Sequence, residues 1–365
     1  MQKPYMESPD NDAKCGLRAW IFYFLGGKME FFGFTLFGSL TGGPIIAIAA
    51  CLFVVGLILV IKGGDWFVDS ASWFAEATGI PKFVVGATVV SFANTLPELL
   101  VSVRAAMNGS AQLAIGNAVG SVTANTTLIM GVSLVAMAGV VSRKEFALKG
   151  GLLLGAVVGL TLLSLSGSLP VWSAFILWAI FLTFMVSNLL EGKKTAGSEV
   201  KGTFEKEEVP SKVLFFVLGT ASIVFGAEFL VSSGKTLASS MGISEAIIGF
   251  TVIALGTSLP EFVTTLTAIR KKENSLSVGN IVGANIIDTT LILPLCAVIN
   301  GRPLAVEKIN LVFDFPVCFA ACAVAIIPTI IQGKFKKWQG YTLLSIYGLY
   351  MLFLVLNEVG VVALA

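Results

Sequence analysis

The chain has 365 residues, of which 56% are hydrophobic and 13% are charged, and its mean hydropathy is +0.89. This is far more apolar surface than one soluble core can bury, with too few charges to cover it. The net charge of +2 argues against a nucleic-acid partner, and the absence of histidine excludes imidazole metal ligands and histidine general bases. The composition therefore indicates an integral membrane protein.

Residues 1–42 form an N-terminal extension that begins with polar sequence. Within it, residues 19–41 are apolar and aromatic, but Lys28 and Glu30 interrupt them. This hydrophobic segment fits an interfacial helix, an uncleaved signal-like piece, or an extension upstream of a start near Met29. The fold can therefore contain one extra hydrophobic segment before its main unit.

Ten apolar segments follow, each near the length of about 20 residues that a helix needs to cross a bilayer. The expected spans are 44–73, 81–107, 111–139, 146–167, 170–190, 212–238, 244–270, 275–299, 306–331 and 338–359. The only long polar stretch, residues 191–211, separates the fifth span from the sixth and is interpreted as a linker. The expected fold class is an all-α integral membrane protein with two five-helix domains, residues 43–190 and 212–365.

The two halves repeat each other without a gap. Residues 86–98 read Gly-Ala-Thr-Val-Val-Ser-Phe-Ala-Asn-Thr-Leu-Pro-Glu, and residues 249–261 read Gly-Phe-Thr-Val-Ile-Ala-Leu-Gly-Thr-Ser-Leu-Pro-Glu. The difference in residue number between Glu98 and Glu261 is called the repeat offset below. The same offset relates residues 116–129 to residues 279–292. Because each half has an odd number of spans, the second half must enter the membrane from the opposite side. We therefore expect two inverted repeats, related by a pseudo-two-fold axis in the membrane plane.

The distribution of basic residues predicts the orientation. The face that carries the linker holds 15 of the 24 Lys and Arg residues, and one more lies within the first span. The positive-inside rule therefore places linker 191–211 in the cytoplasm. We expect a multi-pass protein of the cell inner or plasma membrane.

Two glutamates, Glu98 and Glu261, lie near the middle of matching spans. An ionised carboxylate at that depth costs at least about 2.5 kcal/mol. The proline before each glutamate removes helix hydrogen bonds, and we expect it to release backbone oxygens around Ser91–Asn94 and Ala254–Thr257. Carboxylates in this setting need a cation from outside the chain to balance their charge.

Further oxygen donors share the helical faces of these glutamates. Three and four residues before them stand Asn94, Thr95, Thr257 and Ser258. The next span of each half has a glycine pair at a spacing that lets helix backbones approach closely, followed by residues four apart on one face: Ser121 and Asn125, and Ala284 and Asp288. Hard oxygens without nearby Cys or His suit Na⁺ or Ca²⁺ and argue against zinc or copper.

These motifs resemble a known family. The Gly-Thr-Ser-Leu-Pro-Glu of residues 256–261 and the Gly-Asn-Ile-Val-Gly-Ala-Asn-Ile-Ile-Asp of residues 279–288 are similar to the second alpha repeat of the sodium/calcium exchanger branch of the cation/calcium antiporter superfamily. Residues 86–129 resemble the first repeat. The resemblance covers the whole ten-span unit and implies a prokaryotic-type ten-helix antiporter, not an enzyme, that exchanges Ca²⁺ for Na⁺ by alternating access, with spans 1 and 6 moving.

The resemblance also implies roles for individual residues and no cofactor, since Ca²⁺ and Na⁺ are the transported ions. Glu98 and Glu261 would bind Ca²⁺ together with the carbonyls of Asn94 and Thr257. The flanking Na⁺ ions and the centre of the site would be completed by Thr95, Ser258, Ser121, the carbonyls of Ser91 and Ala254, Asn125 and Asp288.

The chain departs from the family pattern at Ala284, where members usually carry serine, and at residues 93–95, where Ala-Asn-Thr replaces Gly-Thr-Ser. The missing hydroxyl makes a proton-coupled antiporter the main alternative, with H⁺ carried by the same carboxylates. A cation channel is a further alternative, although channels usually arrange acids as a ring of subunits. An intramembrane enzyme is disfavoured because the sequence offers no convincing nucleophile–base pair. The expected partners are these inorganic cations and the lipid bilayer, while the oligomeric state is open.

Overall fold

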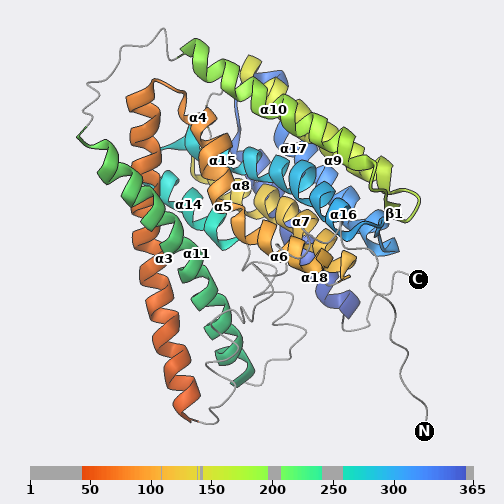
Figure 1. The fold of residues 1–365 in the computed structure, drawn as a ribbon, viewed down its shortest axis with the longest axis horizontal. Coiled ribbons are helices and arrows are strands. Elements are labelled where there is room, and N and C mark those ends of the chain that lie inside the picture. Colours follow the sequence, from red (N-terminus) through yellow and green to blue (C-terminus); the bar gives the residue numbers. More distant parts are fainter. Residues whose placement is uncertain are drawn as a thin grey trace, which may run out of the picture.

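The computed structural model describes residues 43–107, 109–137, 139, 143–195, 207–240 and 258–358, and these are almost entirely helical (Figure 1). Within these ranges, eight helices are long and apolar enough to cross a membrane, and the bent pair Lys82–Asn94 and Leu96–Met107 makes a ninth. The expected seventh span, 244–270, is described only from residue 258. The hydrophobic segment at 19–41 lies outside the described residues.

The first half of the chain contains four of these eight helices together with the bent pair. Its elements are α3 (Gly43–Thr78), α4 (Lys82–Val85), η1 (Gly86–Val90), α5 (Ser91–Asn94), α6 (Leu96–Met107), α7 (Ala111–Ala124), η2 (Asn125–Ile129), α8 (Met130–Ala136), α9 (Arg143–Ser164), β1 (Ser168–Leu169) and α10 (Ser173–Thr195). Three short π-helical or α-helical pieces thus make up the first part of the expected second span.

In the second half the short strand comes one span earlier than in the first half. The described elements of the second half are α11 (Val209–Ser240), α14 (Leu259–Arg270), α15 (Asn274–Ile287), η4 (Asp288–Ile292), α16 (Leu293–Asn300), β2 (Leu304–Ala305), η5 (Asn310–Asp314), α17 (Phe315–Gln332) and α18 (Lys337–Glu358). The π-helical turns η2 and η4 begin at positions related by the repeat offset, so the repeat seen in the sequence extends to this local irregularity of the backbone.

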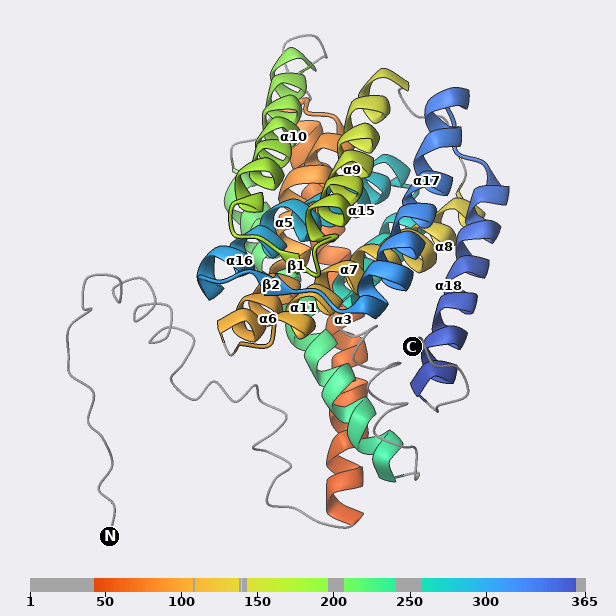
Figure 2. The same cartoon turned by 90° about the vertical axis from the view of Figure 1, so that its right-hand side faces the viewer.

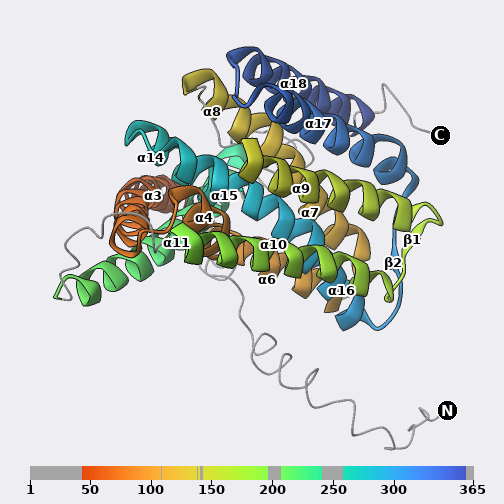
Figure 3. The same cartoon turned by 90° about the horizontal axis from the view of Figure 1, so that it is seen from above.

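Two helical runs form the centre of the bundle. In the most apolar stretches of Ala111–Ala136 and Asn274–Asn300, 78% and 83% of the residues are buried, against 17–39% in the other single-helix spans. Figure 3 shows α7 and α15 in the middle, with α17 and α18 on one side and α3 and α11 on the other. The runs that carry the glycine pairs, Asn125 and Asp288 are therefore the most buried of the single-helix spans.

Helices α3 and α11 lie side by side along one edge of the bundle (Figure 1). They meet at glycines, because a Cβ added at Gly56 would lie 2.9 Å from the Gly226 carbonyl oxygen, and one added at Gly63 would lie 2.9 Å from that of Gly219. The repeat offset relates Gly56 to Gly219 and Gly63 to Gly226, so each contact is the counterpart of the other. A two-fold axis across an antiparallel helix pair produces this reciprocity.

The halves also meet where α15 packs on α4 and η1. Cβ atoms added at Gly279 or Gly283 would collide with backbone oxygens of Phe83 or Ala87, and one added at Gly86 would collide with that of Leu276. Small residues at four-residue spacing allow such backbone contact between membrane helices. The glycine pair of the second half thus fixes α15 against the span that carries Glu98.

Loops of the two halves pair at one end of the bundle. Strands β1 and β2 are antiparallel, with Ser168 opposite Ala305 and Leu169 opposite Leu304, and lie at one end of α9 and α10 (Figure 2). At the linker end, ion pairs join the elements instead. The Lys82 ammonium is 2.7 Å from a Glu273 carboxylate oxygen. These contacts fix the ends of the helices that hold the central residues.

Candidate functional site

Each of the two glutamates lies just after a non-helical residue that precedes the start of a helix. Thr95, between α5 and α6, has φ −79° and ψ 5°, and Ser258, immediately before α14, has φ −86° and ψ 7°. The two residues are related by the repeat offset, and each precedes Leu-Pro-Glu. In the first half, the two helical pieces around the break are bent by 44°. In the first half, Pro97 therefore interrupts the helix as the sequence predicts.

Glu98 and Glu261 lie in the first turns of α6 and α14. A helix N-terminus stabilises negative charge, because its free N–H groups and its macrodipole present a partial positive charge. Both side chains have an exposed fraction of 0%. Within the described part of the chain, none of their four carboxylate oxygens has a hydrogen-bond partner. Such oxygens are costly to bury unless a bound cation or proton satisfies them.

Asn125 and Asp288 begin the π-helical turns η2 and η4. Both side chains are completely buried, and the Asn125 amide oxygen and both Asp288 carboxylate oxygens have no hydrogen-bond partner among the described residues. Glu98 lies within electrostatic reach of Glu261 and Asp288. Single π-helical turns often occur at functional sites, where they re-aim side chains. The structure thus brings the matched acids of both halves into one region.

Hydroxyl groups lie in the same buried regions of these helices. The Ser121 and Ser258 hydroxyls are buried and have no hydrogen-bond partner within the described ranges. The Thr95 hydroxyl instead donates to the Ser91 carbonyl at 2.7 Å. Thr257 and Ala254, which we expected to contribute carbonyl oxygens, lie outside the described residues.

The expected release of the Ser91 carbonyl is wrong for this structure. That oxygen accepts the Thr95 N–H at 2.9 Å as well as the Thr95 hydroxyl. The physical reason is the position of the break: Pro97 cannot donate to the carbonyl four residues earlier, that of Ala93, so the bond to Ser91 is unaffected. The oxygen of Ser91 that is available for a ligand is its hydroxyl.

An amide network that sequence reasoning missed connects the two halves. The Asn94 amide nitrogen donates to the Asn280 amide oxygen at 3.1 Å, and the Thr264 hydroxyl donates to the Asn94 amide oxygen at 3.4 Å. Asn117, the counterpart of Asn280 in the first half, donates to the Glu98 carbonyl at 3.3 Å. The signal for these contacts was the matched pair of asparagines one residue after the first motif glycine. Their amides hold the site helices in place.

The donor set is mainly neutral. Among the described residues, no three His, Cys, Asp or Glu side chains converge closely enough to hold a metal ion. A cation at this place would therefore be held by an acidic pair supplemented by hydroxyl, amide and carbonyl oxygens. Such a shell can exchange a divalent ion for monovalent ions, since it carries few fixed charges and no soft ligand.

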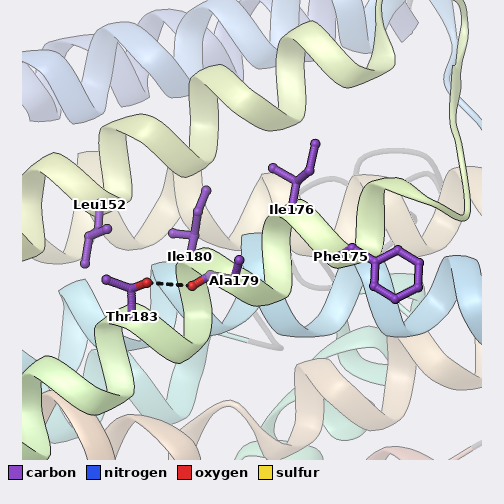
Figure 4. A pocket seen from close by; sticks show the side chains of 6 residues that line it. All are labelled: Leu152, Phe175, Ile176, Ala179, Ile180 and Thr183. Atoms are coloured by element: carbon purple, nitrogen blue, oxygen red, sulfur yellow. Dashed lines mark hydrogen bonds between the residues drawn. The ribbon is translucent and has the colours of Figure 1, made fainter.

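A separate groove lies between α9 and α10 (Figure 4). Apolar side chains dominate its lining, including Leu152, Phe175 and Ile180. Its one hydroxyl, that of Thr183, donates to the Ala179 carbonyl at 2.8 Å. The groove offers a cation no free polar ligand and is distinct from the site around Glu98.

Comparison with known proteins agrees with this geometry. The profile of the family described as "Sodium/calcium exchanger protein" matches residues 48–190 and 211–356. The sodium/calcium exchanger MaX1 of Methanosarcina acetivorans is 28% identical over 355 residues, which covers 85% of this chain and 99% of the relative. The inner membrane protein YrbG of Escherichia coli is 35% identical over 267 residues, covering 69% of this chain and 80% of the relative.

A solved structure also matches. The sodium-calcium exchanger NCX_Mj, soaked with 2.5 mM Na⁺ and 10 mM Sr²⁺, superposes with a TM-score of 0.74 at 26% identity, covering 83% of this chain and 98% of that chain. The matched family, the relative MaX1 and the matched structure are ion exchangers, which are transporters and not enzymes. The chain therefore belongs to the sodium/calcium exchanger family and is a multi-pass membrane protein that acts as a cation/Ca²⁺ antiporter.

Proposed function

We propose that this antiporter exchanges Ca²⁺ for Na⁺ by alternating access, with Ca²⁺ held between Glu98 and Glu261. The two inverted repeats, residues 43–190 and 212–365, each supply one of these glutamates, and residues 191–211 link them in the cytoplasm. The observation that carries the proposal is the complete burial of both glutamates with all four carboxylate oxygens lacking a hydrogen-bond partner among the described residues.

The neutral oxygens determine what the site can exchange. Two carboxylates balance one Ca²⁺, and the same carboxylates with nearby hydroxyls can instead balance Na⁺ ions. In this proposal the remaining ligands are Asn94, Thr257, Thr95, Ser258, Ser121, Asn125, Asp288, Ser91 and Ala254. Because both ion types need the same glutamates, they compete, and an empty charged site should not reorient across lipid. Exchange is then obligatory.

The moving part in this proposal is the pair α3 and α11. Support comes from their position at the edge of the bundle and from their glycine contacts, where the two backbones approach closely. Only 22% and 28% of the most apolar stretches of these helices are buried, against 78% and 83% in the central runs. A helix pair with so little buried surface can slide along the site at lower cost than a central one.

Calcium uptake into Na⁺-loaded proteoliposomes tests the proposal. We expect ⁴⁵Ca²⁺ uptake that requires an outward Na⁺ gradient and is abolished by Glu98→Gln or Glu261→Gln. Glu307→Gln is the matched control, because Glu307 is exposed and lies outside the site. Uptake driven by a pH gradient without Na⁺ would instead establish H⁺ coupling, and flux without any counter-ion would establish a channel.

A further inference from the structure

Two acidic residues of α3 form ion pairs with the C-terminal end of α14. Arg270, the last residue of α14, pairs with Asp65. The ammonium of the next residue, Lys271, lies 3.8 Å from the Asp65 carboxylate and 2.5 Å from the Asp69 carboxylate. Helices α3 and α14 are in contact beside these residues (Figure 1). The pairs therefore connect α3, at the edge of the bundle, to a helix that carries a site glutamate.

The third acidic residue of α3 is held in the same way. The Lys82 ammonium, at the start of α4, lies 2.8 Å from the Glu76 carboxylate and 2.7 Å from that of Glu273, the residue before α15. Nearby, the Trp73 indole N–H donates to a Glu208 carboxylate oxygen at 2.8 Å. Because Glu208 belongs to the linker between the halves, this is the linker end of α3. Every carboxylate of α3 is thus paired with a base outside the α3–α11 pair.

The repeat does not provide the same charges at the opposite end. The repeat offset relates each paired residue to one in the other half, and none of these counterparts is Lys or Arg. Taken in order from Asp65 to Glu273, the counterparts are Glu228, Ser232, Ser239, Glu245, Met107, Asn108 and Ser110. The mirrored contact, between α11 and α6, therefore lacks the bases that hold α3.

We propose that these ion pairs, called the linker-side latch below, favour the conformation in which α3 is docked at the linker end. In inverted repeats, the alternate conformation follows when the two halves exchange their arrangements, so that the contact at one end opens and its mirror image closes. Because the mirrored contact cannot form the same pairs, the latch makes the two conformations unequal in free energy. This inference rests on the proposed movement of α3 and α11.

The latch is weak enough to release during a transport cycle. The Lys82 and Lys271 side chains are 28% and 24% exposed, so water and salt screen their pairs in part. Each such pair contributes a factor of about 1.5 to 5 to an equilibrium constant. Losing the two pairs of Lys271 should therefore shift the conformational equilibrium about threefold to tenfold.

The test compares the two faces of the membrane. In vesicles sorted for one orientation, the Ca²⁺ concentration for half-maximal exchange is measured with Ca²⁺ added on either face. A less populated conformation binds with an apparent affinity that is reduced by its fraction. For Lys271→Glu we expect the half-maximal concentration on the linker face, relative to that on the opposite face, to fall about threefold to tenfold.

Two measurements separate an electrostatic latch from a packing defect. The double variant Asp69→Lys/Lys271→Glu should show a smaller shift than Lys271→Glu, because opposite charges face each other again. Adding choline chloride to ~1 M should move the wild type toward Lys271→Glu, since salt screens exposed pairs. A double variant shifted as far as Lys271→Glu, or a wild type that salt does not move, would contradict the latch.

Lys337→Glu is the matched control for charge. Lys337 is an exposed lysine where α18 begins, and Figure 3 shows α18 on the side of the bundle away from α3. An unchanged ratio of the two half-maximal concentrations in Lys271→Glu, or the same shift in Lys337→Glu, would overturn the inference.

Hydrogen exchange tests the latch without transport. Amide exchange in residues 65–78 should be faster in Lys271→Glu than in wild type or Lys337→Glu, because α3 opens locally more often. If the wild-type protein shows no Na⁺-driven uptake, the proposed exchange fails, but this measurement still decides on the latch. Equal exchange rates in all three proteins would overturn it.

Discussion

Substituting Gly283 with alanine should push α15 of the second half away from η1 of the first half. The added Cβ would lie 2.5 Å from the Ala87 carbonyl oxygen and from the Ser91 hydroxyl oxygen, and the first of these belongs to the backbone and cannot rotate away. Restoring an ordinary contact of about 3.5 Å requires α15 to move by about 1 Å. Overpacking of this kind typically costs about 1–3 kcal/mol, which exceeds the gain of about 0.5–1 kcal/mol from replacing a helical glycine with alanine.

We therefore expect Gly283→Ala to lower the stability of the purified protein by about 1–2 kcal/mol. Thermal unfolding in detergent measures this change, and ⁴⁵Ca²⁺ uptake should fall with it because the Ser91 hydroxyl is displaced. Gly155→Ala is the control, since a Cβ at Gly155 meets nothing within 4 Å. A Gly283→Ala protein as stable and active as Gly155→Ala would refute the close packing of α15 on η1.

Three further predictions concern the ion pairs and pH. Asp65→Asn removes the ion pair between α3 and Arg270 at the end of α14. Because both groups are partly exposed, we expect the free energy of unfolding to fall by at most about 1 kcal/mol. Thermal unfolding should show this loss at low salt and no loss near ~1 M salt. Lys149→Met breaks an ion pair in which the Lys149 ammonium lies 2.6 Å from a Glu191 carboxylate oxygen and the Lys149 side chain is only 1% exposed. The free energy of unfolding should therefore fall by about 3–5 kcal/mol, and by less in the double variant Lys149→Met/Glu191→Leu. Lowering the pH at fixed Ca²⁺ should reduce uptake, because protons compete for the site carboxylates; raising Ca²⁺ should restore it, and inhibition that saturating Ca²⁺ cannot relieve would contradict competition.

Most helix positions could be predicted from hydropathy, because apolar length limits a membrane span. The end of α3 could not. The sequence predicts that the first span ends at residue 73, whereas the helix continues to Thr78. Its polar end is stabilised by a residue far along the chain, since the Lys271 ammonium lies 2.5 Å from the Asp69 carboxylate. Such contacts between distant residues leave no mark in local hydropathy.

The two glutamates of the candidate site stand out in the sequence alone. A glutamate within apolar sequence that recurs in the second half, each time preceded by proline, has few structural explanations. The neutral ligands were harder to predict, because their roles depend on which helices face each other. The bond from Asn94 to Asn280 and the position of the Ser91 hydroxyl beside Gly283 both cross between the halves. Spacing within one half cannot show which oxygen of Ser91 is free.

The most direct test is to locate the ion itself. Crystals of the protein soaked with Sr²⁺, a heavier stand-in for Ca²⁺, would give an anomalous difference peak at each bound ion. We predict one strong peak in contact with the carboxylates of both Glu98 and Glu261, lost in Glu98→Gln. A peak bound elsewhere, or the two carboxylates too far apart to share one ion, would contradict the proposed site.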